Sequence, residues 1–82
     1  MTHLIRILLA DDHPIVRAGV RAELEKIPGA EVVAEAADGR QALELVAAHK
    51  PDLLFIDISM PNLNGLETAI RVTRDFPGTK VI

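Results

Sequence analysis

Short apolar runs alternate with amphipathic stretches along the whole chain. The run Leu4–Ala10 is almost continuously apolar, as is typical of a strand buried on both faces, and the segment 52–57 repeats this pattern. Segment 31–36 combines two valines with two glutamates, which favours an edge strand. Residues 80–82 begin a fourth strand. The pattern therefore predicts four strands, the first and third being the most apolar.

A helix is predicted in each interval between these strands. The first begins at Pro14, a residue suited to the first helical position, and ends at Pro28-Gly29. The second begins after Asp38, a cap residue followed by Gln41, and it or the following turn ends at Pro51. The third ends before Phe76-Pro77-Gly78. The helices carry apolar stripes at residues 16, 20, 24 and 27, at residues 42, 43, 46 and 47, and at residues 66, 69, 70 and 73.

Strand, helix and strand in repetition predict an α/β fold with a parallel sheet and right-handed crossovers. If the two most apolar strands lie inside and the charged strand outside, the strand order is 2-1-3-4. The chain then reverses direction between the first and third strands, so the first helix lies on one face and the other two on the opposite face. Ligands of such sheets bind at the carboxyl ends of the strands, where this reversal occurs.

Composition narrows the classes of function. The chain has 82 residues, of which 49% are hydrophobic, enough for the core of one domain. It has no cysteine, which excludes disulfides and thiolate metal sites. A formal charge of -3, scattered basic residues and the absence of tyrosine and tryptophan argue against a nucleic-acid surface. No apolar run is long enough for a signal peptide or membrane span, so we expect a cytoplasmic protein without a membrane partner.

Three aspartates follow the two most apolar strands. Asp11 and Asp12 close the first and Asp57 closes the third, so we expect their carboxylates to gather at one edge of the sheet. Their mutual repulsion must be offset by protonation, a nearby lysine or a bound divalent cation. A site made only of oxygen ligands favours Mg²⁺ or Mn²⁺ over zinc.

A carboxylate beside such a cation can accept a phosphoryl group. Asp57 is the predicted nucleophile, because it is a single carboxylate facing the acidic pair, with Asp12 holding the metal directly and Asp11 through water. Alone, the acidic pair would be typical of a solvated loop, and the combination with Asp57 favours a site. His13 is interpreted as a rim residue, and Arg17 and Arg21 as the solvent-facing side of the first helix.

Three motifs resemble the receiver domain of bacterial response regulators. They are the acidic pair after the first strand, the segment Asp57-Ile58-Ser59-Met60-Pro61 after the third, and Asn64-Gly65 before the next helix. Segments 11–20 and 61–67 are most similar to the NarL/LuxR-type transcriptional regulators. The resemblance covers the whole chain and implies a flavodoxin-like fold.

The same resemblance implies roles for individual residues. Asp57 would accept a phosphoryl group from the phosphohistidine of a sensor histidine kinase. Mg²⁺, or Mn²⁺, would be held by Asp12, Asp57 and the backbone carbonyl of Ser59, with Asp11 supporting it through water. The chain would then be a regulatory domain of a two-component system and not an enzyme, acting on transcription through a separate DNA-binding domain.

A full receiver would continue beyond the fourth strand with a switch threonine or serine, a fifth strand carrying a lysine and a last helix. We therefore expect residues 1–82 to be the N-terminal part of a receiver domain, without the DNA-binding domain. Lys80 precedes the fourth strand, at the amino end of the sheet, so it is not the lysine of that pattern.

An incomplete sheet would leave apolar surface of the first and third strands exposed, which predicts a homo-oligomer. This supports a second hypothesis, that the chain is a non-catalytic module that only associates with itself. A third, a small hydrolase working through an aspartyl phosphate, is less favoured, since no second acid or base is paired with Asp57 in the sequence.

Overall fold

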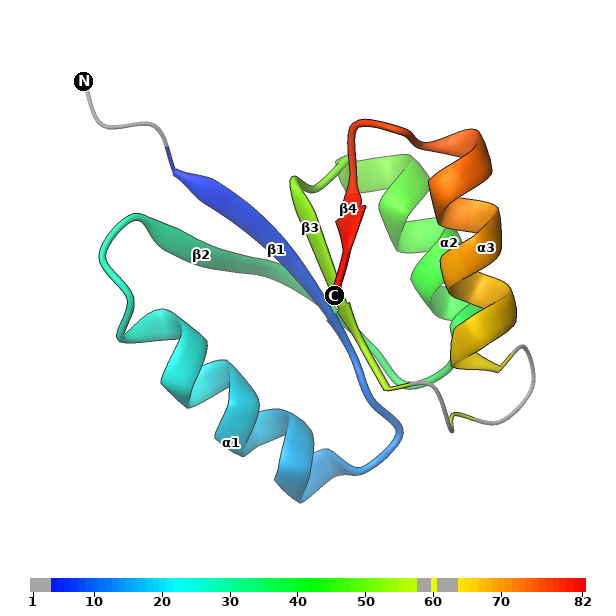
Figure 1. Ribbon diagram of the computed structural model, residues 1–82. Helices are drawn as coiled ribbons and strands as arrows, with labels where there is room; N and C mark the ends of the chain where they lie inside the picture. Colours follow the sequence, from blue (N-terminus) through cyan, green and yellow to red (C-terminus); the bar gives the residue numbers. More distant parts are fainter. Residues whose placement is uncertain (1–3, 58–59, 61–63) are drawn as a thin grey trace.

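Four parallel strands form one sheet in the order β2-β1-β3-β4 in the computed structural model (Figure 1). The structure describes residues 4–57, 60 and 64–82. The predicted order is confirmed, with the charged strand at an edge beside β1. The strands are β1 (Ile5–Ala10), β2 (Ala30–Ala36), β3 (Leu53–Ile56) and β4 (Lys80–Val81).

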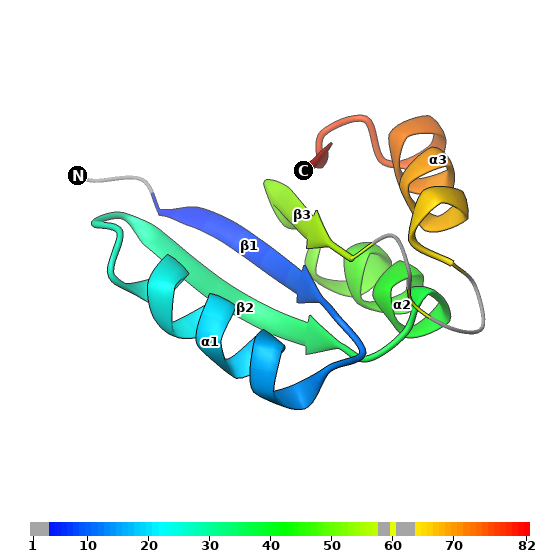
Figure 2. The same cartoon turned by 60° about the horizontal axis from the view of Figure 1, so that its bottom comes forward.

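The helices are α1 (Pro14–Glu25), α2 (Gly39–His49) and α3 (Gly65–Asp75). Helix α1 lies on one side of the sheet, and α2 and α3 lie side by side on the other, as predicted (Figures 1 and 2). The predicted cap of α2 is confirmed, since the Asp38 carboxylate accepts a hydrogen bond from the Gln41 backbone N–H at 2.8 Å. No helix within the described part of the chain is long and apolar enough to cross a membrane.

The main core lies between the sheet and the pair α2 and α3. Helix α3 buries Thr68 and Val72, whereas Leu66 and Ile70 of its apolar stripe are 63% and 52% exposed. Thr68 can be buried because its hydroxyl donates a hydrogen bond to the Asn64 carbonyl at 2.9 Å. The stripe at residues 66, 69, 70 and 73 is therefore not the side that packs. The core consists of Leu8, Ala10, Ala36, Ala42, Val46, Leu54, Ile56, Met60 and Val72.

Helix α1 has no buried residue. Charged side chains therefore make much of its contact with the sheet. Arg17 Nε lies 3.2 Å from Glu35 Oε1 on β2, and the Arg21 guanidinium donates to the other oxygen of the same carboxylate. The hydrogen bond to Glu35 is the main cause of the raised pKa of Arg21. The interpretation as solvent-facing is therefore wrong for Arg17, whose side chain is 22% exposed, whereas Arg21 is 39% exposed and combines a surface pair with Glu25 and its bond to Glu35.

The side chains of β1 on the α1 side are covered more fully than predicted. Ile7 and Leu9 are only 3% and 1% exposed, so the expectation of an exposed apolar surface is wrong for this part of β1. The strand lies between β2 and β3 and under α1, which removes these side chains from water. Within the sheet, apolar exposure is found at its margins, where Ile5 is 47% and Ile82 63% exposed, and Ile15 on α1 is 88% exposed.

A bulge interrupts the pairing of β1 with β2. Ile7 lies opposite Val32 but Leu8 lies opposite Ala34, so Val33 is an extra residue on the edge strand. This shift places Ala34 beside Leu8, where it packs against the main core. The edge strand thus changes the face it presents partway along its length.

Candidate metal centre

Asp11, Asp12 and Asp57, hereafter the carboxylate cluster, meet at the carboxyl ends of β1 and β3, as predicted. Ala10 lies opposite Ile56 at the ends of these neighbouring strands. The Asp57 N–H donates to the Ala10 carbonyl at 3.0 Å, and the Asp11 N–H donates to the Ala36 carbonyl at 3.0 Å. Sheet hydrogen bonding therefore continues to the site and fixes the backbone from which these carboxylates extend.

The Asp11 side chain organises the turn from β1 into α1. It is buried, and its Oδ1 accepts a hydrogen bond from the His13 backbone N–H at 2.8 Å, an Asx turn at the start of the helix. The Asp11 carbonyl in turn accepts a hydrogen bond from the Arg17 guanidinium at 2.7 Å. The acidic pair is thus connected both to the sheet and to α1.

Asp12 carries the clearest sign of a cation site. Its Oδ1 is buried and accepts no hydrogen bond from the described residues. A buried carboxylate oxygen without a donor is costly, and a divalent cation would compensate for it. The hard oxygen donors of the carboxylate cluster therefore fit Mg²⁺ or Mn²⁺, with open positions left for water or phosphoryl oxygens.

The loop after β3 holds the remaining predicted residues. Ser59 lies outside the described residues, so the role of its carbonyl stays a prediction. Met60 is 2% exposed and packs into the main core. Asn64 caps α3 by accepting a hydrogen bond from the Glu67 N–H at 2.8 Å. Lys80 lies opposite Leu53, at the amino end of the sheet and away from the carboxylate cluster, as predicted.

His13 is a residue of the site that the sequence pattern did not predict. The His13 side chain is 62% exposed, as a rim residue would be, but its Nδ1 points inward. That nitrogen lies 2.9 Å from Asp12 Oδ1, 3.2 Å from Asp11 Oδ1 and 3.8 Å from Asp57 Oδ2. One ligand atom from each of these four residues lies within 4.8 Å of all the others. In the sequence, the feature that could have indicated this role is the position of His13, directly after the acidic pair and at the cap of α1.

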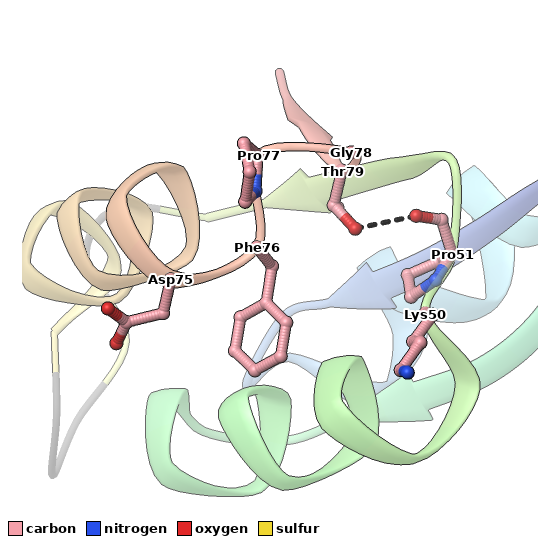
Figure 3. Close-up of a pocket in the computed structure, with 7 residues that line it drawn as sticks. All are labelled: Lys50, Pro51, Asp75, Phe76, Pro77, Gly78 and Thr79. Atoms are coloured by element: carbon pink, nitrogen blue, oxygen red, sulfur yellow. Dashed lines mark hydrogen bonds between the residues drawn. The ribbon is translucent and has the colours of Figure 1, made fainter.

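A pocket of about 260 Å³ lies at the opposite end of the sheet, where residues 50–51 precede β3 and residues 75–79 precede β4 (Figure 3). The Phe76 ring points toward α2, and the Thr79 hydroxyl donates to the Pro51 carbonyl at 2.6 Å. The Asp75 carboxylate is hydrogen-bonded by Arg74, which lowers the pKa of Asp75. These contacts close the end of the core, and they lie far from the carboxylate cluster.

Comparison with known proteins gives relatives over almost the whole chain. The family model described as "Response regulator receiver domain" matches residues 7–82. Response regulator UvrY of Escherichia coli O157:H7 is 42% identical over 79 residues, covering 96% of this chain and 36% of that protein. NarL, the nitrate/nitrite response regulator of Escherichia coli K12, is 48% identical over 62 residues, covering 76% and 29%. The chain thus spans about a third of the length of these relatives.

Solved structures show the same fold. The receiver domain of the putative response regulator NarL from Mycobacterium tuberculosis superposes with a TM-score of 0.89 at 40% identity, covering 96% of this chain and 64% of that chain. The response regulator domain of Thermotoga maritima CheB gives 0.89 at 35% identity, covering 96% and 58%. RcsB from Salmonella enterica, solved on promoter rprA with the phosphomimetic BeF3-, gives 0.87 at 30% identity, covering 96% and 41%. The predicted flavodoxin-like architecture is confirmed.

Proposed function

The chain belongs to the response regulator receiver family, and from this premise we propose that Asp57 accepts a phosphoryl group in a Mg²⁺-dependent step of two-component signalling. The observation that carries the proposal is the meeting of the carboxylate cluster at the carboxyl ends of β1 and β3. The buried, undonated oxygen of Asp12 supports a cation at the same place.

In the proposed reaction an Asp57 carboxylate oxygen attacks the phosphorus of a phosphohistidine on a sensor kinase. The new P–O bond forms as the P–N bond breaks, its electron pair stays on the imidazole nitrogen of the kinase, and an acyl phosphate remains on Asp57. Backbone pairing to Ala10 holds Asp57 beside the acidic pair during this transfer.

Asp12 and Asp57 would hold the cation directly, with Asp11 supporting it through water and the Ser59 carbonyl as a further ligand. A bound Mg²⁺ supplies positive charge opposite the phosphoryl oxygens. Arg17 acts indirectly, because its bond to the Asp11 carbonyl fixes the backbone of the acidic pair.

The output we propose is control of transcription through a separate DNA-binding domain, with a sensor histidine kinase as the phosphoryl donor. The RcsB structure on a promoter with a phosphomimetic supports this reading by relationship. The hypothesis of a module that only associates with itself has no support in the comparisons.

The test incubates the protein with acetyl phosphate and Mg²⁺ and measures its intact mass. We expect one base-labile phosphoryl group that hydroxylamine removes, which Asp57→Asn abolishes and the distant, exposed Asp75→Asn retains. No incorporation into the wild type, or equal incorporation into Asp57→Asn, would contradict the assignment.

A further inference from the structure

His13 places a nitrogen donor among the oxygen donors of the proposed cation site. Its ring emerges from the cap of α1, directly after Asp12, and its Nδ1 points toward all three carboxylates. The backbone N–H of the same residue is bound to Asp11 Oδ1 at 2.8 Å, which limits where the ring can lie. The imidazole is thus positioned by the same Asx turn that orients the Asp11 carboxylate.

Two of the three distances from His13 Nδ1 to the carboxylates match the spacing of adjacent ligands around one octahedral ion. Metal–ligand distances near 2.1 Å separate adjacent ligands of an octahedron by about 3.0 Å, and opposite ligands by about 4.2 Å. His13 Nδ1 lies 2.9 Å from Asp12 Oδ1 and 3.2 Å from Asp11 Oδ1. The distance of 3.8 Å to Asp57 Oδ2 lies between the adjacent and opposite values.

A hydrogen bond alone explains this arrangement less well. Nδ1 meets the geometry of a hydrogen bond with Asp11 Oδ1, but the closer Asp12 Oδ1 has no hydrogen-bond partner among the described residues. One ring nitrogen can donate a single proton, so it cannot serve the carboxylates of both Asp11 and Asp12. A cation between His13 and the carboxylates would be bound both by the Nδ1 lone pair and by the carboxylate oxygens. The proton of the ring would then be on Nε2, on the solvent side.

We propose that His13 Nδ1 is a ligand of the divalent cation in this site, and that it shifts the preference of the site from Mg²⁺ toward later first-row ions that bind imidazole well, such as Co²⁺ and Ni²⁺. The proposal rests on the proposed function for the existence of the cation site. Its chemical basis is that imidazole binds first-row transition ions well, whereas Mg²⁺ prefers oxygen ligands. The acidic cluster alone would supply oxygen only.

The experiment measures the Mg²⁺ and Co²⁺ affinity of the protein by calorimetry, in the absence of any phosphoryl donor. We expect His13→Ala to weaken Co²⁺ binding by at least about tenfold and Mg²⁺ binding by less than about threefold. The visible absorption of bound Co²⁺ should also shift when the nitrogen ligand is lost. His13→Gln, which offers an oxygen in place of nitrogen, should keep Mg²⁺ binding and lose the Co²⁺ preference.

His49→Ala is the matched control, since His49 lies at the end of α2, at the other end of the sheet. It should change neither affinity. An unchanged Co²⁺ affinity and spectrum in His13→Ala, or an equal loss for Co²⁺ and Mg²⁺, would overturn the proposal.

Failure here is distinguishable from failure of the proposed function. If His13→Ala leaves Co²⁺ binding intact while Asp57→Asn still abolishes phosphorylation, only the role of His13 is wrong. If the Co²⁺ preference depends on His13 but Asp57 is not phosphorylated, the assignment of the cation site is supported and the assignment of Asp57 as phosphoryl acceptor is wrong.

Discussion

Removing one negative charge from the carboxylate cluster should stabilise the metal-free chain. Asp12→Asn keeps the shape of the side chain and removes a charge whose Oδ1 is buried without a donor. One oxygen of each carboxylate lies within 4.8 Å of the others, and two unit charges at that distance repel by about 0.9 kcal/mol in water and about 3.5 kcal/mol at an effective dielectric constant of 20. The side chains of Asp12 and Asp57 are 26% and 25% exposed, which places the environment between these limits.

We therefore expect Asp12→Asn to raise the free energy of unfolding by about 1 to 3 kcal/mol without divalent cations. The same change should abolish stabilisation by Mg²⁺, which for the wild type amounts to about 2.7 kcal/mol when the free ion is at roughly 100 times its Kd. If Asp12→Asn is more stable than the wild type without metal and is not stabilised further by Mg²⁺, the three carboxylates are arranged for binding a cation and not for stability.

The assay is urea unfolding followed by far-ultraviolet circular dichroism, with EDTA or with Mg²⁺. Asp75→Asn removes an exposed carboxylate at the other end of α3 and should show neither effect. A metal-free Asp12→Asn chain less stable than the wild type would refute the reasoning, because the carboxylate would then be making a favourable contact. Full Mg²⁺ stabilisation of the variant would refute the role of Asp12 in holding the cation.

Two further predictions concern the scaffold that holds the site. Leu54 is fully buried in β3, so Leu54→Ala should lower the free energy of unfolding by about 2 to 5 kcal/mol in the same urea assay. Leu66 is 63% exposed, so Leu66→Ala should lower it by less than about 1 kcal/mol. Equal losses would mean that the buried side of α3 is misassigned. Glu35 pairs with Arg17 and Arg21, so Glu35→Gln should lower the free energy of unfolding by about 1 kcal/mol and make it less dependent on salt. Glu23 forms an exposed pair with Lys26, so the control Glu23→Gln should change the free energy of unfolding by less than about 0.5 kcal/mol. An unchanged Glu35→Gln would show that α1 is held by packing alone.

The site was predictable as far as it follows from strand order. Asp11, Asp12 and Asp57 each come directly after an apolar run, and parallel neighbours end at one edge, so their meeting needed only the order of the strands. His13 was not predictable in the same way. A residue at a helix cap can turn toward the cluster or toward solvent, and the Asx turn made by Asp11 decides between these orientations.

The contacts of α1 and α3 show the limit of apolar periodicity. Periodicity predicts which residues share a side of a helix, but not which side meets the sheet. In α3 the buried side contains Thr68, since a hydroxyl bonded to the preceding turn can enter the core without an unpaired group. In α1 the decisive contacts join Arg17 and Arg21 to Glu35, which is 18 and 14 residues away in the chain.

The amino-acid sequence by itself determined the local elements, the parallel order of the sheet and the edge at which the aspartates gather. These follow from period, capping and turn residues, which act over a few positions of the chain. Only the tertiary structure decided the bulge at Val33, the buried side of α3, the attachment of α1 and the inward direction of the His13 ring. Each of these features depends on how segments that are distant in the chain pack together and pair their polar groups. Such contacts exist only once the chain has folded.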